Sequence, residues 1–222
     1  MTAAVSTLIR LPQNTIQAMS SIRALILLSL MAAFAGCSVA PVTQTAPSTA
    51  ERKLRAQHLQ QLASIEQFSM QGRIGVQTNG KGFSGSLHWQ HNNTEDDIDL
   101  YSPLGSQVAS IKKTPEQVTL QDASGKHFSA VDAETLTQET LGWRLPLTGL
   151  VDWAIGRPTQ SPIQNSTWNE QGLLTRLEQD GWKIEYDNYE QQGAYMLPGK
   201  IFLKSDPLNL KLLVEKWNNL EH

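Results

Sequence analysis

The feature that most constrains the fold is an alternation of apolar and polar residues on both sides of one turn signal. Apolar residues or glycine occupy every second position over 68–77, and the same alternation returns over 83–90. Successive side chains of a strand point to opposite faces, so each run is typical of a strand with one buried face. Asn79-Gly80 between them has the backbone preferences of a two-residue hairpin turn. The sequence therefore predicts a β-hairpin and an antiparallel sheet that buries one face.

Shorter runs continue this pattern on both sides of an interruption. Polar residues over 92–97 predict a turn, and the Pro- and Ser-containing stretch after Gly156 predicts a loop to about Ser166. Because the predicted strands follow one another through short turns, they form an antiparallel meander. Further strands are predicted over 98–100, 108–111, 118–120, 128–130, 173–178, 182–187, 200–204 and 208–216.

Three segments carry helical signals. A capping-box pattern at 48–51 precedes helical spacing of apolar residues over 50–65, where His58 is expected to be packed. Two more helices are predicted over 133–141 and 146–156, between the two sets of strands. We therefore expect a mainly β (α+β) fold. It is a strongly curved antiparallel sheet, or incomplete β-barrel, with a helical lid over an apolar cavity.

The segment before this domain reads as a secretory signal. Arg23 precedes an apolar run over 24–35, which ends at Gly36 and Cys37, the only cysteine of the chain. The run is shorter than the roughly 20 residues that a membrane-spanning helix needs. A charged start, a short apolar centre and a small-residue junction are typical of a signal peptide. Met19 begins a signal of more usual length, so we expect it to be the true start.

The junction Ala35-Gly36-Cys37 resembles the lipobox of bacterial lipoproteins, with Phe34 where Leu is usual. This resemblance implies lipid attachment at Cys37, and it explains an unpaired cysteine in an exported chain. A buried free thiol or an ordinary cleavage site are the alternatives. Ser38 stands where an Asp would retain the protein in the inner membrane, which indicates the outer membrane. The expected organisation is a lipoprotein signal peptide over 1–36, an acylated N-terminus and flexible tether over 37–49, and a binding domain over 50–222.

The residues offer little support for catalysis or metal binding. Gly82–Ser86 only superficially has the form of a nucleophile elbow, because its glycine spacing and hairpin context are wrong. His88 and His91 are predicted on opposite faces of a strand, as polar surface, and the carboxylates of 95–99 lack calcium-loop spacing, so we interpret them as a solvated hairpin tip. With 18 Lys and Arg against 21 Asp and Glu, nothing indicates nucleic acid. We expect no enzyme activity, no catalytic residue, no metal and no cofactor.

Large apolar residues occupy the inward strand positions and the helical insert. An ordinary core explains them, but a curved sheet under two short helices could also leave a cavity for a lipid-like ligand. The residues expected to line such an acyl-chain cavity are Phe68, Ile74, Trp89, Leu150, Trp153, Trp182 and Tyr186.

Several sequence blocks follow one another along nearly all of the domain: Gly72–Val76, Ser84–Trp89, Ser102–Gly105, Gly142–Pro158, Gln179–Tyr186 and Leu197-Pro198. In this order, these blocks resemble the LolB family of outer-membrane lipoprotein receptors. The resemblance implies an open barrel whose cavity accepts acyl chains of lipoproteins from a soluble periplasmic carrier of the LolA type and releases them into the outer membrane. It implies no nucleotide and no cofactor, and we expect a monomer whose partners are the carrier, acylated cargo and outer-membrane lipid.

Leu104 stands out because turn residues are normally polar. Pro103 and Gly105 favour a turn between two strands, and the Leu between them could fold back on its own hairpin. The family resemblance instead implies that Pro103, Leu104 and Gly105 form a protruding loop that enters the membrane during transfer. An alternative function is a lipid-anchored assembly factor that docks a protein partner through its apolar sheet face, and a third is a lipid-anchored hydrolase.

Overall fold

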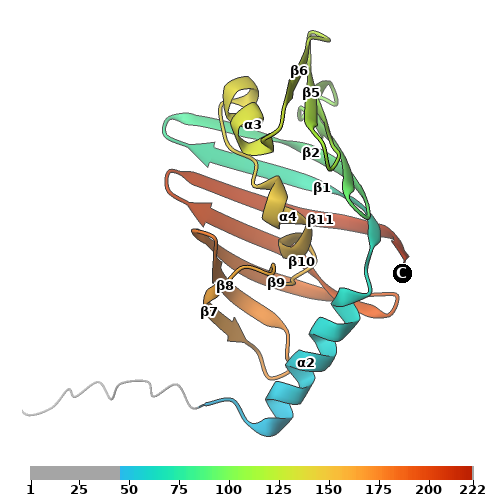
Figure 1. Ribbon diagram of the computed structural model, residues 1–222, viewed down its shortest axis with the longest axis vertical. Helices are drawn as coiled ribbons and strands as arrows, with labels where there is room; N and C mark the ends of the chain where they lie inside the picture. The colour runs from blue at the N-terminus through green and yellow to red at the C-terminus, as the bar shows by residue number, and fades with distance from the viewer. Residues whose placement is uncertain (1–45, 222) are drawn as a thin grey trace, which may run out of the picture. The chain divides into compact units, whose positions relative to one another are not determined.

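The computed structural model describes residues 46–221 (Figure 1). The predicted signal peptide, Cys37 and most of the tether lie outside the described residues. Within the described part, three helices and eleven strands follow in the order α2 (Thr49–Ala63), β1 (Gln67–Thr78), β2 (Lys81–Asn92), β3 (Glu95–Tyr101), β4 (Gln107–Lys113), β5 (Val118–Asp122), β6 (His127–Ala130), α3 (Ala133–Leu141), α4 (Leu147–Ala154), β7 (Ile163–Trp168), β8 (Leu174–Gln179), β9 (Trp182–Gln192), β10 (Tyr195–Ser205) and β11 (Leu208–Glu221).

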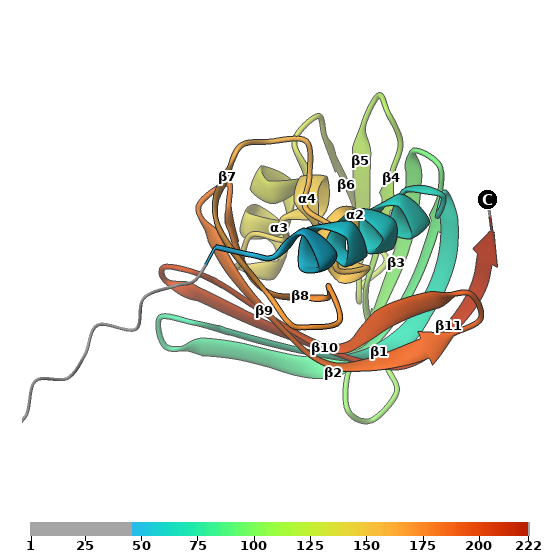
Figure 2. The same cartoon turned by 90° about the horizontal axis from the view of Figure 1, so that it is seen from below.

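All strands belong to one antiparallel sheet with the order β6-β5-β4-β3-β2-β1-β11-β10-β9-β8-β7. The sheet is strongly curved and remains open, because β6 and β7 are its two edges. The chain passes from one edge to the other through α3 and α4, and Figure 2 shows all three helices on the concave side. The expected fold class, a curved open sheet with helices over its hollow, is confirmed.

The β1–β2 hairpin has the predicted register. Val76 pairs with Phe83 and Thr78 with Lys81, so Asn79-Gly80 forms the two-residue turn, with Gly80 at φ +76°. That backbone conformation is open to glycine without steric cost. Along both strands, alternate side chains are buried on the concave side.

The helix ends also follow the sequence signals. The side chain of Ser48 accepts a hydrogen bond from the Glu51 backbone N–H (3.2 Å), while the Glu51 carboxylate accepts one from the Ser48 N–H (2.6 Å). This is the predicted capping box of α2. Asp132 caps α3 through the N–H groups of Glu134 and Thr135. His58 is packed against the core as expected.

Two predicted segments differ from the structure. The loop expected up to about Ser166 contains β7, an edge strand that pairs with β8. β7 is mostly polar and exposed, so it lacks the alternation by which a half-buried strand is recognised. The turn expected over 92–97 is shorter, because β3 already begins at Glu95.

The core lies between the concave face of the sheet and the helices. Its largest fully buried side chains come from the sheet, from α2 and from the segment around α4, including Trp89, Met70, Leu62 and Trp153. Within residues 46–221, no helix combines the length and the hydrophobicity that crossing a membrane requires.

Candidate functional site

The residues predicted to line a cavity all belong to the core under the helices. Six of the seven are buried, and Trp182 is half-buried against the same cluster. Ring contacts join them in two groups: Phe68 meets Trp89 edge-on at 5.0 Å between centroids, and Trp153 lies 6.2 Å from Trp182. The structure therefore shows these side chains packed against one another. Their role in binding acyl chains stays a prediction.

Helix α4 is held over the sheet by a buried amide. The indole N–H of Trp153 donates to Oε1 of Gln179 at 3.1 Å, and both side chains are buried. The amide nitrogen of Gln179 donates in turn to the carbonyls of Thr159 and Ser161, in the segment that leads from α4 to β7. One side chain of β8 thus fixes the helix and the chain that follows it.

A glycine permits this position of Trp153. A Cβ atom at Gly149 would lie 2.6 Å from the Trp153 ring, which is closer than real Cβ atoms approach other atoms. The ring therefore folds against the backbone of its own helix only because residue 149 has no side chain.

Arg157 connects the end of α4 to the end of α2. Its Nε donates to the carboxylate of Asp152 at 2.6 Å, and its Nη1 donates to the backbone carbonyl of Leu62 at 2.8 Å. Helix α4 is therefore linked to α2 through Arg157 and to the sheet through Gln179.

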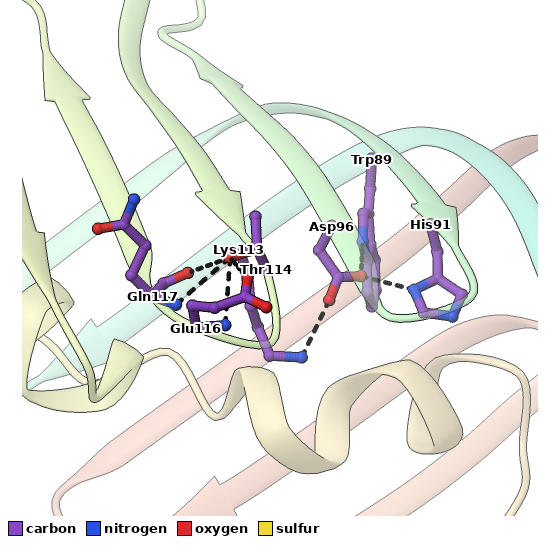
Figure 3. Close-up of polar contacts among 7 residues, drawn as sticks. All are labelled: Trp89, His91, Asp96, Lys113, Thr114, Glu116 and Gln117. Carbon is purple, nitrogen blue, oxygen red and sulfur yellow. Dashed lines mark hydrogen bonds and ion pairs between the residues drawn. The ribbon is translucent and has the colours of Figure 1, made fainter.

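Figure 3 shows three side chains converging on the carboxylate of Asp96. Oδ1 accepts hydrogen bonds from Nε1 of Trp89 (2.9 Å) and from Nδ1 of His91 (2.8 Å), and Oδ2 accepts one from Nζ of Lys113 (3.2 Å). Asp96 is only 1% exposed. Three neighbouring strands, β2, β3 and β4, supply these groups, so the network fixes the Trp89 ring.

The turn beside this network holds Lys113 in place. The hydroxyl of Thr114 donates to the Glu116 carboxylate (2.9 Å), and the backbone N–H of Thr114 donates to the Gln117 carbonyl (2.9 Å), as Figure 3 shows. These contacts close the β4–β5 turn directly after Lys113.

Asp96 and His91 were not recognised from the sequence. The interpretation of 95–99 as a solvated tip is wrong at Asp96, and the interpretation of His91 as polar surface is wrong, whereas His88 is exposed as expected. The signal that was missed is the position of Asp96 in the strand. Asp96, Ile98 and Leu100 are each two residues apart, so all three side chains point to the same, buried face of the sheet. Polar side chains at such positions need partners, and the network supplies them.

The hydroxyl of Tyr186 is a second buried polar group. It has no hydrogen-bond partner among the described residues. Burial raises the pKa of Tyr186 well above its ordinary value, so the phenol stays protonated and can donate. Among the described residues, the Tyr186 hydroxyl is thus a buried donor that no hydrogen bond occupies.

A polar pocket of about 720 Å³ opens beside the Asp96 network. It lies between the β2–β3 and β4–β5 turns, the start of α3 and α4. Val131, which is 88% exposed, stands at its rim. Its polar lining includes His91, Lys113, Asp132, Asp152 and Arg157.

The loop from Ser102 to Ser106 presents Leu104 to solvent. The N–H of Gly105 donates to the Ser102 carbonyl (2.9 Å) and the N–H of Ser102 to the Ser106 carbonyl (2.8 Å), which closes a tight turn. Leu104 is 95% exposed, so the alternative in which it folds back on its hairpin is wrong. In Figure 2 this loop, between β3 and β4, extends past the convex side of the sheet, opposite the helices.

The described residues contain no group of three or more His, Cys, Asp or Glu side chains arranged to hold a metal ion. The acidic and imidazole groups that do meet, at Asp96, are occupied by one another and by Lys113 and Trp89. The contacts at Asp96 therefore fix the positions of the Trp89, His91 and Lys113 side chains.

The lowered pKa values of two buried groups, Asp96 and His58, predict that the protein loses stability in acid. Burial alone would raise the pKa of Asp96, but the hydrogen bonds from His91 and Trp89 and the charge of Lys113 outweigh it and lower the pKa below 3.8. Burial lowers the pKa of His58 below 6.5, and its Nε2 has no partner among the described residues. In both cases the unfolded chain takes up the proton first, so stability falls as the pH falls.

We therefore expect the free energy of unfolding to decline in two stages, first below pH 6.5 through His58 and again below pH 3.8 through Asp96. Urea titrations at a series of pH values measure this. His58→Phe, which keeps a ring beside Tyr189, should remove the first stage and leave the second. An unchanged first stage in that variant would assign it to another group.

The family model and the related sequences indicate the same family. The family model described as outer membrane lipoprotein LolB matches residues 66–217. The chain is 32% identical over 196 residues to the outer-membrane lipoprotein LolB of Pseudomonas syringae, covering 88% of this chain and 96% of that one. It is 34% identical over 194 residues to that of Nitrosococcus oceani, covering 87% and 95%. Among solved structures, a LolA-superfamily protein from Nitrosomonas europaea has a TM-score of 0.44 and 8% identity, over 74% of this chain and 92% of that chain.

Proposed function

The chain belongs to the LolB family, and from this premise we propose that it is a lipid-anchored receptor for lipoproteins at the outer membrane. It accepts acylated lipoproteins from a soluble periplasmic carrier of the LolA type and inserts them into the outer membrane. Cys37 is its lipid attachment site, and two or more acyl chains hold such a domain on a membrane stably. The role requires no catalytic residue and no cofactor.

The observation that carries this proposal is Leu104, a large apolar side chain that is 95% exposed at the tip of a tight turn. Contact with lipid removes that side chain from water and contributes about 1.5–3 kcal/mol. This is too little to anchor a protein but enough to hold the loop of Pro103, Leu104 and Gly105 against a bilayer while cargo is released.

Acyl chains enter the core under the helices when α4 moves away from the sheet. The cavity then forms between the seven residues predicted for it, two of which, Leu150 and Trp153, belong to α4 itself. Each buried methylene contributes about 0.8 kcal/mol, so cargo passes to whichever protein binds its chains better, without ATP. The free hydroxyl of Tyr186 can donate a hydrogen bond to an ester or amide carbonyl of the cargo.

The test is Leu104→Glu. We expect the variant to fold, to accept cargo from the carrier, and to release it poorly, because a carboxylate at the tip opposes entry into lipid. The measurement loads the protein with a labelled lipoprotein, adds vesicles of outer-membrane phospholipids, and follows transfer. Thermal unfolding should match the parent, since the residue has almost no packing to lose.

Val131→Glu is the matched control. Val131 is also apolar and highly exposed, but it lines the pocket on the concave side, away from the β3–β4 loop. Release from the preloaded Val131→Glu protein should equal that of the parent. Normal release by Leu104→Glu would contradict the proposal, and equal binding of lipidated and unlipidated cargo would favour the assembly-factor function instead.

A further inference from the structure

The convex face of the sheet carries a half-buried aromatic ring among lysines. Ile201 and Leu203 of β10 are buried in the core, so Phe202 between them points to the opposite, convex side. The ammonium groups of Lys200 and Lys211 lie over its ring, 5.2 and 5.3 Å from the centroid. Cations over an aromatic face are attracted to it, so the ring holds these charges together.

Two further lysines complete this cluster. Lys204 and Lys183 are direct partners across β10 and β9, and both are exposed. Like charges opposite each other on a sheet are destabilising, so the pair is unfavourable unless an anion lies between them. The nearby acidic groups are Glu185 and Glu178, the strand partners of Phe202 and Lys183.

The charges of this cluster are largely unpaired. Lys200 lies 3.6 Å from Asp187. Among the described residues, Lys183, Lys204 and Lys211 make no ion pair with a carboxylate. These three lysines and Phe202 border one groove of about 580 Å³, and we call them the basic aromatic patch.

The patch continues to the Leu104 loop. A second groove of about 440 Å³ on the same sheet is lined by Pro103 and Arg73, and it shares Lys211 and Gly75 with the first. The β3–β4 loop extends past this convex side in Figure 2. A flat surface that touches the loop therefore comes close to the patch as well.

We propose that the basic aromatic patch docks on the anionic phospholipid headgroups of the membrane in which the protein is anchored. The three lysines contact lipid phosphates and Phe202 lies at the level of the headgroups, while the helices on the concave side face away from the bilayer. Charge complementarity supports this occupant: the whole chain has a net charge of −3, so an anionic surface repels most of it and attracts this patch. The inference rests on the proposed membrane role.

The test uses the full acylated protein in two sets of vesicles, one containing phosphatidylglycerol and one of phosphatidylcholine alone. A water-soluble amine reagent labels the lysines, and mass spectrometry measures the extent at each. In phosphatidylglycerol vesicles we expect labelling of Lys183, Lys204 and Lys211 to fall by about fivefold at low salt. High salt should restore it, because mobile ions screen exposed charges.

Lys53, Lys112 and Lys126 are the internal control, since all three are exposed and lie outside the patch. Their labelling should be equal in both vesicle types. Equal labelling of the patch lysines in both would overturn the proposal. If the patch lysines were protected from labelling only after the carrier protein is added, the patch would bind an acidic protein partner. That result would also overturn the proposal.

A variant separates this inference from the proposed function. Lys183→Gln/Lys204→Gln/Lys211→Gln should slow cargo release into phosphatidylglycerol vesicles and leave release into phosphatidylcholine unchanged, whereas Lys53→Gln/Lys112→Gln/Lys126→Gln should change neither. The labelling experiment requires no cargo, so its result is independent of the release assay with Leu104→Glu. The patch proposal can therefore fail while the proposed function holds, and the proposed function can fail while the patch proposal holds. If both triple variants slowed release equally, the effect would come from the change in net charge and not from the position of the patch, which would contradict the proposal.

Discussion

Asp96→Ala is expected to lower the free energy of unfolding by about 3–5 kcal/mol, because removing one partner of a buried ion pair leaves the others uncompensated. The ammonium of Lys113, the ring of His91 and the indole N–H of Trp89 all lose their acceptor. Urea unfolding followed by tryptophan fluorescence measures the loss as a shift of the midpoint at constant slope. Trp89 should also become more mobile, which fluorescence anisotropy detects.

Asp97→Ala is the matched control. Asp97 is the next residue of β3 and pairs with Lys112 at 2.9 Å, but both side chains are exposed. Exposed pairs contribute about 0–1 kcal/mol, so this variant should remain close to the parent. A loss for Asp96→Ala no larger than that for Asp97→Ala would show that the network does not hold the core.

Trp153→Ala is expected to have two effects of opposite sign. Removing a buried indole from the core costs about 3–5 kcal/mol in stability. It also leaves, under α4, an apolar space that a fatty-acyl chain can fill without displacing the helix. We therefore expect a fluorescent fatty-acyl probe to bind the variant more tightly than the parent, and to raise its melting temperature by a larger increment.

Trp153→Phe separates the ring from its hydrogen bond. It retains most of the apolar volume but loses the donor to Gln179, so we expect a loss of about 1–3 kcal/mol and little gain in probe affinity. If Trp153→Ala is destabilised yet binds the probe no better than the parent does, the space under α4 is an ordinary core and not the route of acyl chains.

Much of the fold could be predicted because its signals are local. The register of the β1–β2 hairpin follows from Asn79-Gly80 and the alternation around it, and the start of α2 follows from Ser48 and Glu51. These features depend on residues a few positions apart. The edge strand β7 could not be recognised in this way, since it exists through pairing with β8 and buries little.

The candidate site was predicted less completely for a related reason. The alternation along a strand and the size of its residues indicate which side chains face the core. They do not indicate whether those side chains fill the core or leave a cavity in it. Trp89 and Trp153 are packed closely here, and each is held by a polar side chain of another element, Asp96 on the adjacent strand β3 and Gln179 on β8. Leu104 could be recognised from the sequence because a large apolar residue is unusual in a turn. Its exposure, however, could be established only from the structure.

The two edges of the sheet have a consequence for self-association. An unpaired edge strand can recruit a strand from a neighbouring molecule, and membrane anchoring concentrates neighbours in two dimensions. Here the edges are short: β6 has four residues, and β7 has six, directly after Pro162. Because α3 and α4 form the chain between these edges, the movement of α4 proposed for cargo entry would act on the chain beside them. Edges this short offer few backbone groups to a strand of a neighbouring molecule, so they would disfavour such pairing even during that movement.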